Sequence, residues 1–317
     1  MSCTHDTLAS YTRDGSYGPT RTKTVTQRFE QNLRGALRRI NAAIKRAVIE
    51  EDIFGLANDG TDTLAVDSPP PLRTENNARK TVLFIQWLRE QLDTGLLEVV
   101  QRNENPYIRS AYAQGIRLAT SQLQERGIDP ATVDIAEIVE QGNFNRGLQV
   151  LFTRTYDFLE DTADELVREV RDELMEGFSR GESPREMADR ISDRVDSVGK
   201  SRATMIARTE IIHAHSEAAV QRYEDVSERQ DANIGLRHVG RLTANDARVC
   251  PACRRLEDSV FTFDEFRSAT FEFRGTVYRV GIPSHPHGRC APMPQVGVDL
   301  DGLPPLSERV PGTLITS

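Results

Sequence analysis

Apolar residues recur every three or four positions through most of the first 230 residues, which is the spacing of amphipathic helices. Polar and charged residues fill the positions between them. Five stretches carry this pattern, at residues 26–53, 82–96, 108–123, 144–178 and 201–230. Ser183-Pro-Arg-Glu186 is a capping box with proline at the first helical position, and it predicts one more short helix that ends near Val195.

The pattern changes after Gly235, where β-branched and aromatic residues alternate or gather in short runs. These runs predict short strands at residues 236–240, 259–263 and 271–280. Prolines at positions 283, 286, 292 and 294 are expected to interrupt regular structure after them. The predicted fold class is therefore mainly α, a helical bundle with a small C-terminal α+β module.

Composition shifts divide the chain further. A run of Asp, Gly and Pro residues predicts a linker, and tails are expected at both ends. The expected parts are a flexible tail (1–25), a basic amphipathic helix or arm (26–57), a linker (58–77), a helical domain (78–231), the α+β module (232–295) and a C-terminal tail (296–317).

Charge and hydropathy limit the classes of function. Of 317 residues 28% are charged, and no apolar run approaches the roughly 18 residues that span a bilayer, so no membrane partner is expected. The N-terminus lacks a secretory signal pattern, which favours a reducing compartment and free thiols. A net charge of -8 argues against a protein that coats nucleic acid along its whole surface.

One N-terminal stretch is nevertheless basic. Between residues 21 and 46, Glu30 is the only acidic residue. A solvated helix face accounts for this pattern, and so does contact with DNA or an acidic partner. The candidate nucleic-acid contacts are Arg34, Arg38, Arg39, Lys45 and Arg46.

The last third of the chain gathers cysteine and histidine. Cys250-Pro-Ala-Cys253 can present two thiolates to one tetrahedral ion, and Cys290 with His285 or His287 can complete the shell. A module of about sixty residues is marginal alone, and a structural Zn²⁺ contributes folding free energy directly. Only one of the two histidines can bind in a four-coordinate site. A redox Cys-x-x-Cys expects an alternating α/β context that is absent here, while buried free cysteines stay an alternative.

An enzyme interpretation uses different residues. His215 and Glu217, followed by Cys250 and Cys253, resemble the zinc deaminase pattern of one His, two Cys and a proton-transferring Glu. Against it, His215 lies in a long amphipathic helix, and the pattern leaves the segment before Cys290 without a role. No phosphate-binding loop, nucleophile elbow or His-Glu-x-x-His pair occurs. We predict no catalytic residue.

An ordered set of short segments between residues 181 and 290 resembles the Mu F-like head morphogenesis family, the minor head proteins of tailed viruses. The segments are Gly181-Glu-Ser-Pro-Arg-Glu-Met-Ala188 with Ile191, Ile206-Ala-Arg208-Thr209-Glu210, Asp246 with Val249-Cys-Pro-Ala-Cys253 and Leu256, and Pro283 with His285-Pro286 and Arg289-Cys290. The family commonly ends in His-Pro-x-Cys-Arg-Cys, and here Gly288 replaces the first of these cysteines. The fourth ligand is therefore open between His285 and His287.

The resemblance implies a minor capsid protein located in the virion head near the portal vertex, and in the host cytoplasm during assembly. Its implied partners are the portal protein and the major capsid protein, and packaged double-stranded DNA is a further candidate. The alternatives are a zinc-dependent nucleic-acid enzyme and a zinc-stapled DNA-binding module. The segment Arg208-Thr209-Glu210 is expected to hold neighbouring elements by salt bridges rather than to catalyse.

Overall fold

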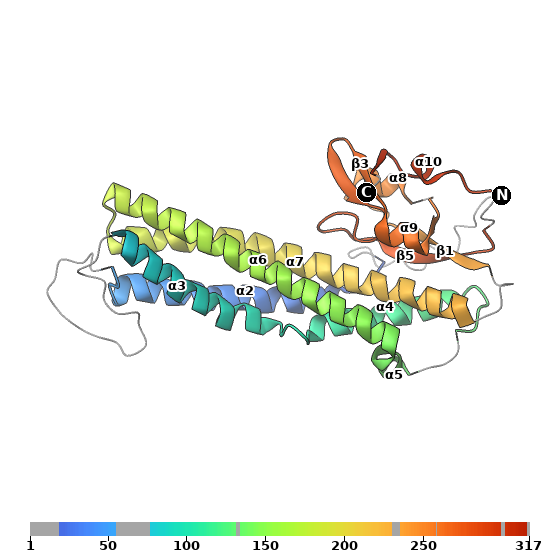
Figure 1. Cartoon of the computed structure of the whole chain (residues 1–317), viewed down its shortest axis with the longest axis horizontal. Coiled ribbons are helices and arrows are strands. Elements are labelled where there is room, and N and C mark those ends of the chain that lie inside the picture. The colour runs from blue at the N-terminus through green and yellow to red at the C-terminus, as the bar shows by residue number, and fades with distance from the viewer. Residues whose placement is uncertain are drawn as a thin grey trace. The chain divides into compact units, whose positions relative to one another are not determined.

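The computed structural model describes residues 19–54, 77–130, 134–229, 235–257, 259–298 and 302–315 (Figure 1). The chain forms two compact units, each assembled from segments that are distant in sequence. The bundle unit comprises Arg28–Glu104 and Phe152–Ile206, and the site unit comprises Met1–Gln27, Asn105–Leu151 and Ala207–Ser317. The predicted linker lies outside the described residues except for Asn77, and so does the predicted N-terminal tail as far as residue 18.

The bundle unit is built from helices. They are most of α2 (Lys23–Lys45), a π-helical turn (Arg46–Glu50), α3 (Asn77–Gly95), a short 3-10 turn (Leu97–Val99), and parts of α6 (Gly142–Arg180) and α7 (Pro184–Arg229). Ion pairs link neighbouring helices, such as Arg202 of α7 with Glu165 of α6 at 2.6 Å. No described helix combines the length and apolar composition that a membrane crossing needs.

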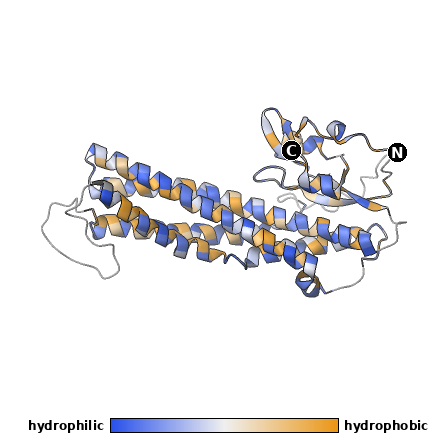
Figure 2. Cartoon of the chain, viewed as in Figure 1, coloured by the Kyte–Doolittle hydropathy of each residue, from blue (hydrophilic) through white to orange (hydrophobic). Residues whose placement is uncertain are grey.

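The predicted apolar stripes form the core of the bundle unit. Figure 2 shows hydrophobic positions alternating with hydrophilic ones along each helix. The buried side chains include Leu33, Leu37, Ile40 and Ile44 of α2, Leu88 and Leu92 of α3, Leu159, Leu166, Val170 and Leu174 of α6, and Ile191 and Val195 of α7. One predicted member, Val82, is instead 54% exposed. Phe84 lies on the buried face instead, because it precedes Leu88 by four residues, and its ring lies 5.2 Å from that of Phe54.

Helix α7 is continuous, and the predicted separation into two helices is wrong. Its capping box forms as expected, with the Ser183 N–H donating to Glu186 Oε2 at 2.9 Å. Gly199 falls inside the helix rather than ending it. A Cβ atom there would lie 2.9 Å from Leu37 Cδ1, so the glycine lets α2 approach α7 closely. The contact between helices outweighs the weak helix propensity of glycine.

The helices of the site unit are α4 (Pro106–Gln124), α5 (Ile135–Glu140), the first turns of α6 and the last turns of α7. Asn105 caps α4 by accepting the N–H groups of Tyr107 and Ile108. The Tyr112 hydroxyl of α4 donates to Gln221 of α7. Residues 78–231 are thus shared between two units rather than forming one helical domain, because their apolar stripes pack against different neighbours.

Two small antiparallel sheets complete the site unit. The first has the order β2 (Phe261–Thr262), β1 (Leu236–Leu242), β5 (Ala291–Val296), and the second has the order β4 (Thr276–Arg279), β3 (Thr270–Phe273), β6 (Thr313–Ile315). Short helices lie between the strands: α8 (Pro251–Arg255), α9 (Phe263–Ser268) and α10 (Leu306–Arg309). The strands predicted around residues 236–240, 259–263 and 271–280 are confirmed.

Two expectations at the C-terminal end are corrected. Strand β5 forms despite Pro292 and Pro294, because it lies at a sheet edge where a missing N–H is tolerated. The segment expected to be a tail contains α10 and β6, and β6 pairs with β3. Arg309 fastens this segment by donating to both carboxylate oxygens of Glu265, at 2.9 and 2.6 Å.

Candidate metal centre

The two cysteines of Cys250-Pro-Ala-Cys253 lie on one tight turn. Cys250 is the N-cap of α8, Pro251 occupies the first helical position, and the Cys253 N–H donates to Cys250 Sγ at 3.3 Å. Proline suits this position because it needs no backbone hydrogen bond there. Cys253 is buried and Cys250 is half-buried, and their sulfur atoms lie within 4.8 Å of each other.

His285 is the histidine that the fold brings to this turn. The ligand atoms of Cys250, Cys253 and His285 all lie within 4.8 Å of one another. Two sulfur atoms on a tetrahedral zinc ion with 2.3 Å bonds lie about 3.8 Å apart. The ligand atoms would therefore have to move only slightly closer together to bind the ion. The Nδ1 atom of His285 lies 2.7 Å from the Pro286 carbonyl oxygen. A carbonyl only accepts, so Nδ1 carries the proton and Nε2 keeps its lone pair for a ligand.

Cys290 joins the cluster through Cys253. It is 4% exposed, directly precedes β5, and its thiol is hydrogen-bonded with that of Cys253. This hydrogen bond lowers the pKa of Cys253, and the nearby Arg241 guanidinium acts in the same direction. The same hydrogen bond, together with burial, raises the pKa of Cys290. The Cys253 thiol is therefore the more acidic of the two.

His287 does not join the cluster. Its side chain is exposed, and its backbone has a positive φ of 65°. The His287 backbone N–H donates to Thr209 Oγ1 of α7 at 3.3 Å. Thr209, in the Arg208-Thr209-Glu210 segment, therefore holds the histidine-bearing segment against α7.

A bidentate ion pair joins the two ends of the cluster. Arg289 donates to both carboxylate oxygens of Asp246, at 2.7 and 2.5 Å. The pair ties the segment before Cys250 to the residue before Cys290. The hydrogen bonds from Arg289 hold the pKa of Asp246 well below its usual range, so the pair stays ionised at neutral pH.

Gly288 stands in a confined position. A Cβ atom there would lie 3.1 Å from Pro283 Cβ and 3.3 Å from the His285 carbonyl oxygen. A cysteine at this position would need a shift of a few tenths of an ångström. The segment is therefore shaped around a glycine, and its donors are His285 and Cys290.

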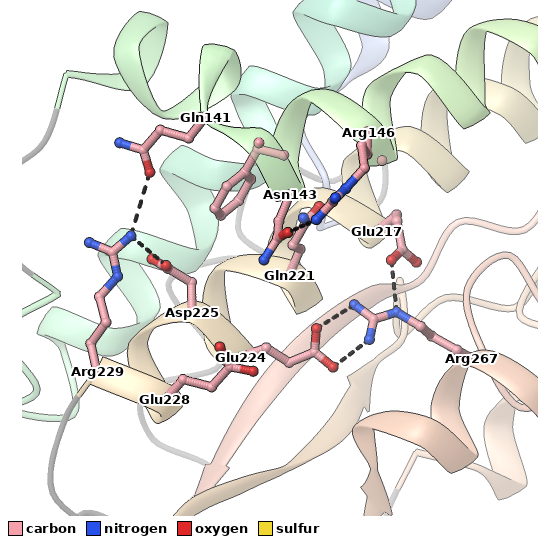
Figure 3. A pocket seen from close by; sticks show the side chains of 13 residues that line it. Gln141, Asn143, Arg146, Glu217, Gln221, Glu224, Asp225, Glu228, Arg229 and Arg267 are labelled. Atoms are coloured by element: carbon pink, nitrogen blue, oxygen red, sulfur yellow. Dashed lines mark hydrogen bonds and ion pairs between the residues drawn. The ribbon is translucent and has the colours of Figure 1, made fainter.

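The deaminase-like set is not assembled. His215 is fully buried in α7, and burial lowers its pKa to about 3. Among the described residues, the only group of three or more candidate ligands is that of Cys250, Cys253 and His285. Glu217 instead accepts from Arg267 Nε at 2.8 Å (Figure 3). Its carboxylate is engaged in holding α9 to α7, away from the cysteines.

Figure 3 shows the open polar pocket, about 580 Å³ in volume, in which Glu217 and Arg267 lie. Arg267 also donates to Glu224, at 2.7 Å from Nη2. The pocket lies between the first turn of α6, the last turns of α7 and α9. Its charged groups are largely paired with one another, which indicates a structural connection between these helices.

The five basic candidates on the N-terminal helix differ in their surroundings. Arg34 pairs with Glu30 at 2.5 Å and donates to Thr204 at 2.9 Å, and Lys45 lies 3.7 Å from Asp189. The side chains of Arg38, Arg39 and Arg46 are exposed, and within the described part of the chain no ion pair involves them.

One residue beside the cluster was not predicted from the sequence. Arg241 of β1 is 1% exposed and reaches Cys253 Sγ at 3.8 Å. A charged residue within a run of otherwise buried strand positions was the available signal.

Part of the chain matches a known family of proteins. Residues 168–293 match the family model described as "Phage Mu protein F like protein". No curated protein and no solved structure shows significant similarity to the chain. The matched region contains all four residues of the cysteine and histidine cluster.

Proposed function

We propose that this chain, whose residues 168–293 match the phage Mu protein F-like family, is a minor head protein of a tailed virus that is stabilised by a structural zinc ion. The family match is the observation that carries the proposal. The head morphogenesis role predicted from short sequence segments agrees with this family. No described residue needs to catalyse a reaction in such a role.

The proposed metal site consists of Cys250, Cys253, Cys290 and His285. Three sulfur donors and one imidazole are the donor set that a structural Zn²⁺ prefers. The ion would supply a rigid cross-link between the α8 turn and the segment that enters β5. These residues would hold it while Thr209 and the ion pair of Asp246 with Arg289 orient the loop around it. Support comes from the mutual proximity of the ligand atoms of Cys250, Cys253 and His285, and from the hydrogen bond that joins the Cys290 thiol to Cys253.

We further propose that the protein acts near the portal vertex of the head and meets the portal or the major capsid protein in the host cytoplasm during assembly. The family supports a virion location, and the helical bundle unit offers a long surface for docking. The zinc-binding region would then provide a second, rigid surface for contact with a partner.

Co-expression with the portal and major capsid proteins of the same virus tests this role. The full chain should co-purify with at least one of them, and it should be found in purified heads by mass spectrometry. The Cys250→Ser/Cys253→Ser double variant should be recovered at least several-fold less with the same partner. A chain that elutes alone from both partners and is missing from heads would contradict the proposal.

A second candidate function, contact with packaged DNA, is favoured by Arg38, Arg39 and Arg46. These three exposed cations lie along one helical stretch, with no described acidic side chain in ion pair with any of them. Phosphate contacts of this kind make binding fall linearly with the logarithm of salt concentration.

We expect the triple variant Arg38→Gln/Arg39→Gln/Arg46→Gln to bind double-stranded DNA more weakly. The slope of log K against log salt should fall by roughly 2.7, which is about 0.9 for each lost contact. Arg34→Gln is the matched control, because Arg34 is already engaged by Glu30 and should leave the slope unchanged. Fluorescence anisotropy over a salt series measures both. Equal slopes for the wild type and the triple variant would rule out this DNA contact.

A further inference from the structure

Arg241 is a buried cation within hydrogen-bonding distance of the cysteine cluster. Its side chain lies in β1 and is 1% exposed. No carboxylate among the described residues forms an ion pair with it, although burying an uncompensated charge is costly. Its Nη2 lies 3.8 Å from Cys253 Sγ, and the guanidinium also interacts with the thiol of Cys290.

The other nitrogen, Nη1, contacts the segment that leads to His285. It donates to the carbonyl oxygen of Val280, to that of Gly281 at 3.4 Å, and to Ser284 Oγ at 2.6 Å. One planar guanidinium therefore connects the α8 turn with the residue that directly precedes His285. The guanidinium of arginine is planar and rigid and carries several N–H donors, so one side chain can contact two segments at once.

We propose that Arg241 is the positioning and charge-compensating residue of the metal site, and this inference rests on the zinc site proposed above. A divalent ion with three thiolates and one neutral imidazole carries a net charge of -1. The single positive charge of Arg241 offsets it inside a low-dielectric interior. The hydrogen bonds to Val280, Gly281 and Ser284 hold the second half of the ligand set at the distance the ion needs.

The charge assignment also explains the ligand number. A fourth thiolate would leave a net charge of -2 beside one buried cation. In this chain position 288 is glycine and the fourth donor is a neutral histidine. The buried arginine and the three-cysteine, one-histidine set are therefore electrostatically matched.

Zinc affinity of the full chain, measured by competition with a chromophoric chelator, tests the inference. Arg241→Gln removes the charge and should lower zinc affinity by roughly 10- to 100-fold, the range for partners of metal ligands. Arg241→Lys keeps the charge but loses the planar guanidinium, so its affinity should lie between that of the wild type and that of Arg241→Gln. Cobalt substituted for zinc should show a weaker thiolate charge-transfer band in the glutamine variant.

Arg222 provides the matched control. It is 2% exposed and lies in the same unit, but its guanidinium contacts Asp225 and the Pro130 carbonyl rather than the cysteines. Arg222→Gln should lower the melting temperature and leave zinc affinity within about twofold of the wild type.

Several outcomes would overturn the proposal. One is that Arg241→Gln binds zinc as tightly as the wild type does. Another is that Arg241→Lys or Arg222→Gln loses as much zinc affinity as Arg241→Gln does. If Arg241→Gln does not fold, Ser284→Ala carries the test, since it removes one acceptor of Arg241 and should weaken zinc binding a few-fold. Unchanged binding in Ser284→Ala would then contradict it. A wild-type chain without zinc affinity would overturn the zinc site itself, which is a distinguishable result.

Discussion

Replacing Cys253 by serine is expected to lower zinc affinity about 100-fold and to unfold the part of the chain around the two small sheets. Cys253 is the centre of the cluster, since it contacts Cys250, Cys290 and Arg241. A structural zinc site contributes about 10–16 kcal/mol, so one of four ligands accounts for roughly 3 kcal/mol, or about 100-fold in affinity. Chelator competition measures the affinity, and circular dichroism measures the loss of folding.

The two histidines provide a matched pair for the same experiment. His285→Ala should lose zinc affinity to a similar extent, because its ring lies with Cys250 and Cys253. His287→Ala should keep wild-type affinity, because its side chain is exposed and lies outside the group of Cys250, Cys253 and His285. The reverse result, with loss in His287→Ala and none in His285→Ala, would show that the ligand assignment is wrong.

Gly115→Ala is expected to destabilise the site unit strongly. A Cβ atom at position 115 would lie 2.1 Å from the His215 carbonyl oxygen and 2.9 Å from its carbonyl carbon. Both atoms belong to the backbone of α7, so α4 and α7 would have to move apart. Overpacking of this kind costs about 3 kcal/mol, which corresponds to a fall of roughly 10 °C in melting temperature.

Gly35→Ala is the control for this substitution. Gly35 lies within α2, and the nearest atom to its added Cβ would be the flexible end of Arg39, at 3.6 Å. Alanine there should stabilise the helix by up to about 1 kcal/mol. Urea unfolding of both variants gives the comparison. If Gly115→Ala were as stable as Gly35→Ala, the close approach of α4 and α7 would be contradicted.

The sequence was most informative where periodicity extends over many residues. The stripe from Phe29 to Ile44 predicted one buried helix face, and the capping box at Ser183 and Glu186 predicted where α7 begins. Both features depend on local spacing. The functional prediction also rested on local spacing. In segments such as Cys250-Pro-Ala-Cys253, a tight turn can place two cysteines side by side.

Features that depend on distant contacts were not predictable. The sequence predicts that a helix ends near Val195, and the contact between Leu37 and Gly199 shows how α7 continues past this point. Strand β5 contains two prolines and is tolerated because of its place at a sheet edge. Strand β6 is three residues long and is recognisable only through its pairing with β3.

The identity of the histidine ligand was equally undetermined. His285 and His287 are both close to Cys290 in sequence, and no spacing rule separates them. The structure brings His285 to Cys250 and Cys253 and leaves the His287 side chain exposed, so His285 is the proposed ligand. Arg241 likewise acquires its role only when β1 brings it beside Cys253.

Native mass spectrometry of the full chain, purified without chelator, tests most directly the proposal that a structural zinc ion stabilises this assembly protein. We expect a mass increase that corresponds to one zinc ion per chain, lost together with folded structure when a strong chelator is added. A folded chain of bare polypeptide mass, unchanged by added zinc, would contradict the account.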